Sequence, residues 1–122
     1  MGVDKPTGDE SLTELFINKT VVEKVLLQAE KDLYPYFDGQ EVVARLDQLS
    51  FQEVRDIMGA SLREIDKGSS GELWAVLYRV DIAESDYMKK LGESNYYGKL
   101  AEAILDRELK KVLFRLHYSQ GD

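Results

Sequence analysis

The sequence predicts an all-α protein, a compact bundle of five or six helices in a single domain. Apolar residues recur every three or four positions along most of the chain, which is the spacing of one buried helix face. The chain has 122 residues, 43% of them hydrophobic, and this is enough for one domain with its own core. A short strand over residues 72–80 is the alternative that the pattern leaves open, because that segment also alternates like a strand.

We expect a flexible polar segment over residues 1–10, a helical domain over 11–118 and a frayed end over 119–122. The domain opens with one interrupted helix, or two short ones, reaching to about residue 34, with the joint at residues 18–20. Each piece begins with a capping box, in which a hydroxyl side chain is followed three residues later by glutamate: Ser11 with Glu14, and Thr20 with Glu23.

A turn over residues 34–39 follows, because Pro35 disfavours helix in the preceding residue and Asp38-Gly39 allows the chain to reverse. Residues 40–47 predict a short helix. The next helix is capped by Ser50 and has an apolar stripe that extends to residue 65.

Gly59 lies inside that helix at a cost of about 1 kcal/mol relative to Ala, so we expect a close helix contact there. Residues 67–71 predict a loop by composition. For residues 73–82 we favour a helix, because a lone strand would have no partner of similar strength. Such a helix is apolar nearly all round, so we expect it to be central, with Trp74 and Tyr78 packed in the core.

The C-terminal part predicts two further helices. Residues 83–91 form an amphipathic helix ending at Gly92, and the longest helix runs from Tyr96 to about His117 with Asn95 as its cap. The expected buried stripe of the longest helix comprises Leu100, Ala101, Ile104, Leu105, Leu109, Val112, Leu113 and Leu116.

The net charge of −7 lies entirely in residues 1–66, which hold seven Lys/Arg and fourteen Asp/Glu, whereas residues 67–122 hold nine of each. A negative chain repels phosphate backbones, which disfavours general nucleic-acid binding. The absence of cysteine excludes disulfides and thiolate metal sites. Residues 1–10 lack the apolar run of a signal peptide, and no stretch is long and apolar enough to span a membrane, so we expect a cytoplasmic protein.

Catalytic and cofactor motifs are missing. His117 is the single histidine and stands at the end of the last helix. Glu102 and Asp106 share a helix face, but two carboxylates alone lack the spacing of a metal or acid–base site. We therefore expect no metal and no cofactor, and favour a protein that is not an enzyme.

The aromatic residues suggest an interaction surface. Tyr36 and Phe37 cluster at a turn and Tyr96 and Tyr97 at a helix start, in polar, glycine-containing surroundings that fit partial exposure as well as core packing. The first hypothesis is therefore a small acidic protein-interaction module that associates with itself.

Two alternatives remain. In one, a cleft near Trp74, Tyr78, Arg79 and Asp81 binds a small molecule or a substrate. In the other, Arg107, Lys111 and Arg115, which are four residues apart on the last helix, make a weak nucleic-acid contact. A simpler interpretation of these cations is a solvated helix end whose acids offset them, in the pairs Asp106 with Lys110 and Glu108 with Lys111.

Overall fold

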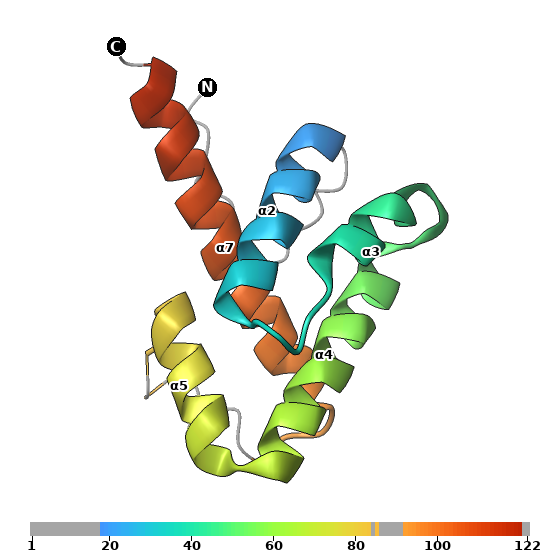
Figure 1. Ribbon diagram of the computed structural model, residues 1–122, viewed down its shortest axis with the longest axis vertical. Coiled ribbons are helices and arrows are strands. Elements are labelled where there is room, and N and C mark those ends of the chain that lie inside the picture. Colours follow the sequence, from blue (N-terminus) through green and yellow to red (C-terminus); the bar gives the residue numbers. More distant parts are fainter. Residues whose placement is uncertain (1–17, 84, 86–91, 121–122) are drawn as a thin grey trace.

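The computed structural model describes residues 18–83, 85 and 92–120, and every regular element in this part of the chain is helical (Figure 1). The all-α prediction is confirmed. The elements are α2 (Lys19–Asp32), α3 (Gly39–Ala44), the short 3-10 helix η1 (Leu46–Gln48), α4 (Phe51–Gly68), α5 (Ser70–Val80) and α7 (Tyr96–Gln120). The predicted first helical piece over residues 11–17 and nearly all of the predicted helix over 83–91 lie outside the described residues.

The longest helix, α7, is the element around which the others pack. Its most extensive contacts are with α4 and α2, and α5 contacts α4, α2 and α7. In Figure 1 the C-terminal turns of α7 extend past the ends of α4 and α5. These turns of α7 therefore have fewer of the described helices beside them than the rest of α7.

The helix starts follow local capping chemistry, with one correction. Ser50 caps α4 and completes the predicted capping box with Glu53. The cap of α2, however, is Asn18, whose side chain accepts a hydrogen bond from the Val21 amide at 3.2 Å. Thr20 lies within the first turn instead, because Asn is at least as good an N-cap as Thr and it comes first in the chain.

The predicted loop over residues 67–71 is wrong. Helix α4 continues through Gly68 and α5 begins at Ser70, so Ser69 alone connects them. Ser69 has an extended backbone, and its side chain accepts a hydrogen bond from the Glu72 amide at 3.3 Å. One residue that both ends a helix and caps the next replaces the five-residue loop.

Helix α5 confirms the helical interpretation of residues 72–80 and removes the strand alternative. Its expected central position is wrong, since Tyr78 is 86% exposed and Trp74 is also on the exposed side. The neighbouring helices cover only one face of α5, formed by Leu73, Val76, Leu77 and Val80.

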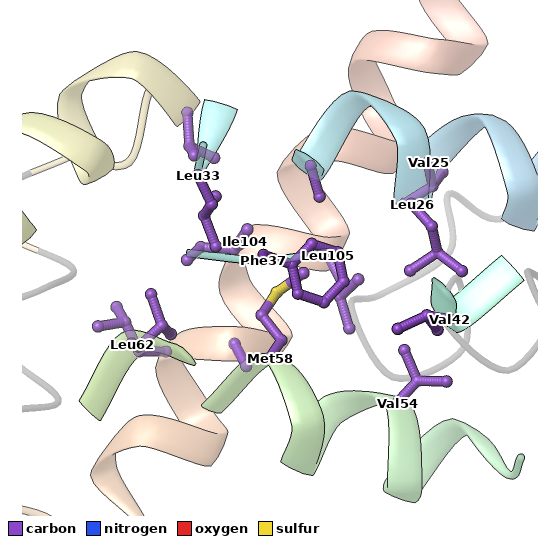
Figure 2. Close-up of a cluster of buried hydrophobic side chains, with 14 of the residues drawn as sticks. Val25, Leu26, Leu33, Phe37, Val42, Val54, Met58, Leu62, Ile104 and Leu105 are labelled. Carbon is purple, nitrogen blue, oxygen red and sulfur yellow. The ribbon is translucent and has the colours of Figure 1, made fainter. Parts of the chain in front are cut away.

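The core lies between α2, α4 and α7, and Phe37 from the turn after α2 is part of it. Figure 2 shows Phe37 beside Met58 of α4 and Leu105 of α7, and only 2% of Phe37 is exposed. Where α4 meets the start of α7, a Cβ on Gly59 would lie 3.4 Å from the Tyr97 backbone. This confirms the close helix contact predicted at Gly59.

The predicted stripe of α7 is confirmed except toward its C-terminal end. Six of its eight members are buried, Leu116 is partly buried and Leu113 is 47% exposed. The helix also continues to Gln120, beyond the predicted end near His117.

Candidate functional site

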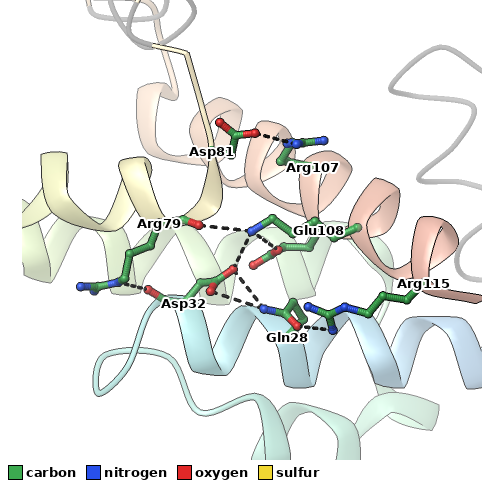
Figure 3. Close-up of polar contacts among 8 residues, drawn as sticks. Gln28, Asp32, Arg79, Asp81, Arg107, Glu108 and Arg115 are labelled. Atoms are coloured by element: carbon green, nitrogen blue, oxygen red, sulfur yellow. Dashed lines mark hydrogen bonds and ion pairs between the residues drawn. The ribbon is translucent and has the colours of Figure 1, made fainter.

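A buried carboxyl group lies where α2 meets α7 (Figure 3). None of Glu108 is exposed (0%), and its carboxyl group points toward that of Asp32 at the end of α2. The Lys111 Nζ atom is 3.4 Å from Glu108 Oε1 and 3.0 Å from Asp32 Oδ2. One ammonium group therefore faces two carboxyl groups.

Protonation of Glu108 balances these charges. Burial, and after it the neighbouring Asp32 carboxyl, raise the pKa of Glu108 to about 8. Lys111 lies 3.4 Å from Glu108 Oε1, but neither Glu108 oxygen accepts a hydrogen bond of good geometry from the described residues, as an ionised buried carboxylate would need. A protonated Glu108 can instead donate to Asp32. Burial by itself raises the pKa of Asp32, but hydrogen bonds involving Glu108, Lys111 and Gln28 outweigh burial and lower this pKa.

Lys111 also connects the ends of two helices to α7. Its Nζ atom donates to the backbone carbonyl oxygen of Arg79 in α5 at 3.2 Å. Arg79 Nε in turn donates to the backbone carbonyl oxygen of Asp32 at 3.0 Å. The last carbonyl groups of a helix lack intrahelical partners, and a cation there also interacts favourably with the helix dipole. These contacts join α2, α5 and α7 at one point.

Gln28 links this buried group to the surface. Its Nε2 atom lies 3.4 Å from both Asp32 carboxylate oxygens, and its Oε1 atom accepts a hydrogen bond from Arg115 Nη1 at 2.7 Å (Figure 3). Arg115 lies on α7, one turn beyond Lys111. The polar side chains therefore continue from the buried carboxyl pair to the rim of a surface groove.

This surface groove, which we call the α2/α7 groove, has a volume of about 210 Å³. Its apolar members are Leu27 on α2 and Val112 and Leu116 on α7. The rest of its lining comprises Lys24, Gln28, Lys31 and Arg115. Among the described residues no carboxylate lines the groove, and its three charged side chains are all cations.

The basic stripe of α7 is largely used inside the molecule. Arg107 Nη2 is 2.6 Å from Asp81 Oδ2, Lys111 binds Asp32, and Arg115 donates to Gln28. The predicted pairs of Asp106 with Lys110 at 3.0 Å and Glu108 with Lys111 at 3.4 Å are both present. Arg107, Lys111 and Arg115 each have a polar partner within the molecule.

The four residues of the predicted cleft make separate contacts. Tyr78 and Trp74 are on the exposed side of α5, Arg79 donates to the end of α2, and Asp81 binds Arg107 on α7. Arg79 is itself exposed, although it lies in the apolar run of α5. Asp81 has a left-handed backbone (φ 76°) and is the C-cap of α5.

The four aromatic residues predicted at an interface lie in two places. Tyr36 is 40% exposed, but Phe37 is in the core and is not available to a partner. Tyr96 and Tyr97 are partly buried at the start of α7, with their ring centroids 5.0 Å apart. The Tyr97 hydroxyl donates to Asp66 Oδ2 at 2.6 Å. Phe37 is buried because the turn after α2 folds back over α4 and α7, which local sequence does not reveal.

A second hollow of about 620 Å³ lies between α4 and the start of α7. Its lining includes Arg55, Arg63 and Tyr97, and it has no large aliphatic side chain. Arg55 binds Asp56 and Glu102, and the Arg63 guanidinium lies 5.5 Å from the centre of the Tyr97 ring. Small-molecule pockets are mostly apolar, so this hollow is a weaker candidate than the α2/α7 groove.

Sequence reasoning missed Glu108, Lys24, Leu27 and Lys31 as site residues. A signal for Glu108 was present: it lies four residues from both Ile104 and Val112, inside the buried stripe of α7. The groove residues gave no such signal, because their proximity to α7 depends on how the two helices pack.

The described residues hold no cluster of three or more His, Cys, Asp or Glu side chains that could bind a metal. None of the described helices combines the length and apolar character needed to cross a membrane. Comparison of the chain with protein-family models, curated proteins and solved structures gives no match.

Proposed function

We propose that this protein is a non-enzymatic protein-interaction module, and that the α2/α7 groove receives a helical segment of its partner. The observation that carries the proposal is the apolar floor of the groove, where Leu27 is 39% exposed and lies near Val112 and Leu116. Apolar surface with a polar rim is typical of interaction sites. A groove between two helices suits the apolar face of a docking helix.

The size of the groove supports a protein partner over a small ligand. Pockets for small molecules usually have volumes of about 300–1,000 Å³, and the groove, at about 210 Å³, is smaller. It suits the insertion of one or two anchoring side chains from a larger partner, the arrangement that commonly dominates binding energy at interfaces.

The proposal is tested by selecting binders from a displayed library of amphipathic helical peptides. We expect selected peptides to shift the backbone amide NMR signals of Leu27 and Leu116, and Leu27→Asp to abolish their binding. Tyr78→Ser is the matched control, because Tyr78 is an exposed apolar side chain on α5 outside the groove. No selected binder, or binders whose shifts map elsewhere, would contradict the proposal.

Self-association is a second form of the same proposal, favoured by the exposed Leu113 and Phe114 on α7. Two copies pairing groove to groove would bring together cations that have no ion-pair partner among the described residues. The cations around Phe114 mostly pair with acids of the same molecule, as Arg107 and Lys110 do, so we place self-association on this other face of α7. Light scattering over a concentration series tests it: the mass should rise with concentration, and Phe114→Ser should reduce the rise. A monomer at every concentration would refute self-association.

A further inference from the structure

The cations of the α2/α7 groove lack carboxylate partners among the described residues. Lys24 and Lys31 take part in none of the ion pairs of that part of the chain, and Arg115 donates to the neutral amide of Gln28. Other cations of α7 bind acids within the molecule, as Arg107 does. Within the described part of the chain, positive charge without an ion-pair partner is therefore concentrated at the rim of this apolar groove.

The geometry of this rim is regular. Lys24 and Lys31 are seven residues apart on α2, which places them on the same helix face about 10 Å apart along the axis. Leu27 lies between them, and Arg115 faces them from α7. Arg115 has five N–H donors, so its bond to Gln28 leaves others for a carboxylate.

Building on the proposed function, we infer that the partner segment is an acidic amphipathic helix. It carries two carboxylates seven residues apart that meet Lys24 and Lys31, and apolar side chains between them that reach Leu27, Val112 and Leu116. A third carboxylate on its other side meets Arg115. The apolar floor favours such a helix over a nucleic acid, whose phosphates would gain nothing from it.

The test uses the full chain and two synthetic peptides of about 14 residues, a length at which helices begin to form in water. Both peptides have leucines at helical spacing. One has glutamates seven residues apart, and the other has glutamine at the same positions. Fluorescence anisotropy should give about tenfold tighter binding of the glutamate peptide, since two partly exposed ion pairs each contribute a modest gain. This preference should shrink as salt is raised.

Charge reversal gives the decisive comparison. In the Lys24→Glu/Lys31→Glu variant we expect the preference to invert, so that a peptide with lysines at the two positions binds more tightly than the glutamate peptide. Lys67→Glu is the control, because Lys67 is an exposed lysine on α4 outside the groove, and it should leave the preference unchanged.

The possible results separate the two claims. Equal binding of the glutamate and glutamine peptides would support a groove that binds a helix but overturn the inference that this helix is acidic. No binding of either peptide would overturn both claims. Displacement of the glutamate peptide by RNA, lost in the double lysine variant, would assign the cations to a nucleic acid and overturn the inference of an acidic helix.

Discussion

Glu108 should make this protein less stable as the pH rises, and Glu108→Gln should remove that effect. The pKa of Glu108 in the folded protein is raised from 4.5 to about 8, first by burial and then by Asp32. Between these values the folded state keeps a proton that the unfolded chain has released. The free energy of unfolding therefore falls as the pH rises through this window.

The magnitude follows from the same shift. Each tenfold change in proton affinity corresponds to about 1.4 kcal/mol, so the wild-type protein should lose about 3 kcal/mol of stability between pH 5 and pH 8. For a chain of this size the loss lowers the midpoint of thermal unfolding by about 10 °C. Asp32 contributes a pH dependence of the opposite sign. Its pKa is lowered from 3.8 in the folded protein, so the stability that it contributes is present above pH 3.8 and is lost on acidification. The pair together is most stable near pH 4 to 5.

Urea unfolding followed by circular dichroism across this pH range measures the effect. Glutamine at position 108 is neutral at every pH, and its amide can donate to Asp32. The variant should show a nearly constant free energy of unfolding from pH 5 to pH 8 and exceed the wild type at pH 8. Glu102→Gln is the control on the same helix, since Glu102 is partly exposed and binds Arg55, and it should retain the wild-type slope.

The reasoning would be refuted by a Glu108→Gln variant that keeps the wild-type pH slope, because another group would then carry the titration. A variant less stable than the wild type at pH 8 would also refute it, since Glu108 would then be stabilising as an anion paired with Lys111.

Three further predictions concern packing and capping. Phe37→Ala should lower the free energy of unfolding in urea by about 3–5 kcal/mol, because it empties a core position. Tyr36→Ala, at the neighbouring exposed position, should lower it by less than about 1 kcal/mol. Equal losses would contradict the burial of Phe37. Gly59→Ala should leave the midpoint of thermal unfolding unchanged or raise it, because the new Cβ would meet the α7 backbone at 3.4 Å, an ordinary contact distance. Gly39→Ala should lower the midpoint, because the new Cβ would overlap a backbone carbonyl of α2. Ser50→Ala should cost about 1 kcal/mol by removing the capping box of α4, and no measurable loss would show that this box adds little.

The sequence alone determined where the helices of the described part lie and which face most of them bury. Their signals are local: apolar residues at helical spacing, the box of Ser50 and Glu53, and the glycine that marks a close contact at position 59. Such signals depend on residues three or four positions apart, which the helix itself brings together. For this reason the fold class, the start of α4 at the Ser50 cap and the helical state of residues 72–80 could be predicted, whereas the end of α4 could not.

Tertiary structure decided how these helices meet, and with it the candidate site. Lys111 binds a carboxylate 79 positions away, and Arg79 reaches the end of a helix 47 positions away. The burial of Phe37, the exposure of Tyr78 and the protonation of Glu108 depend on the same long-range packing. The α2/α7 groove exists only because α2 and α7 lie side by side. Its apolar floor and its cations come from two helices whose periodicities are independent, so no pattern within either helix predicts the groove.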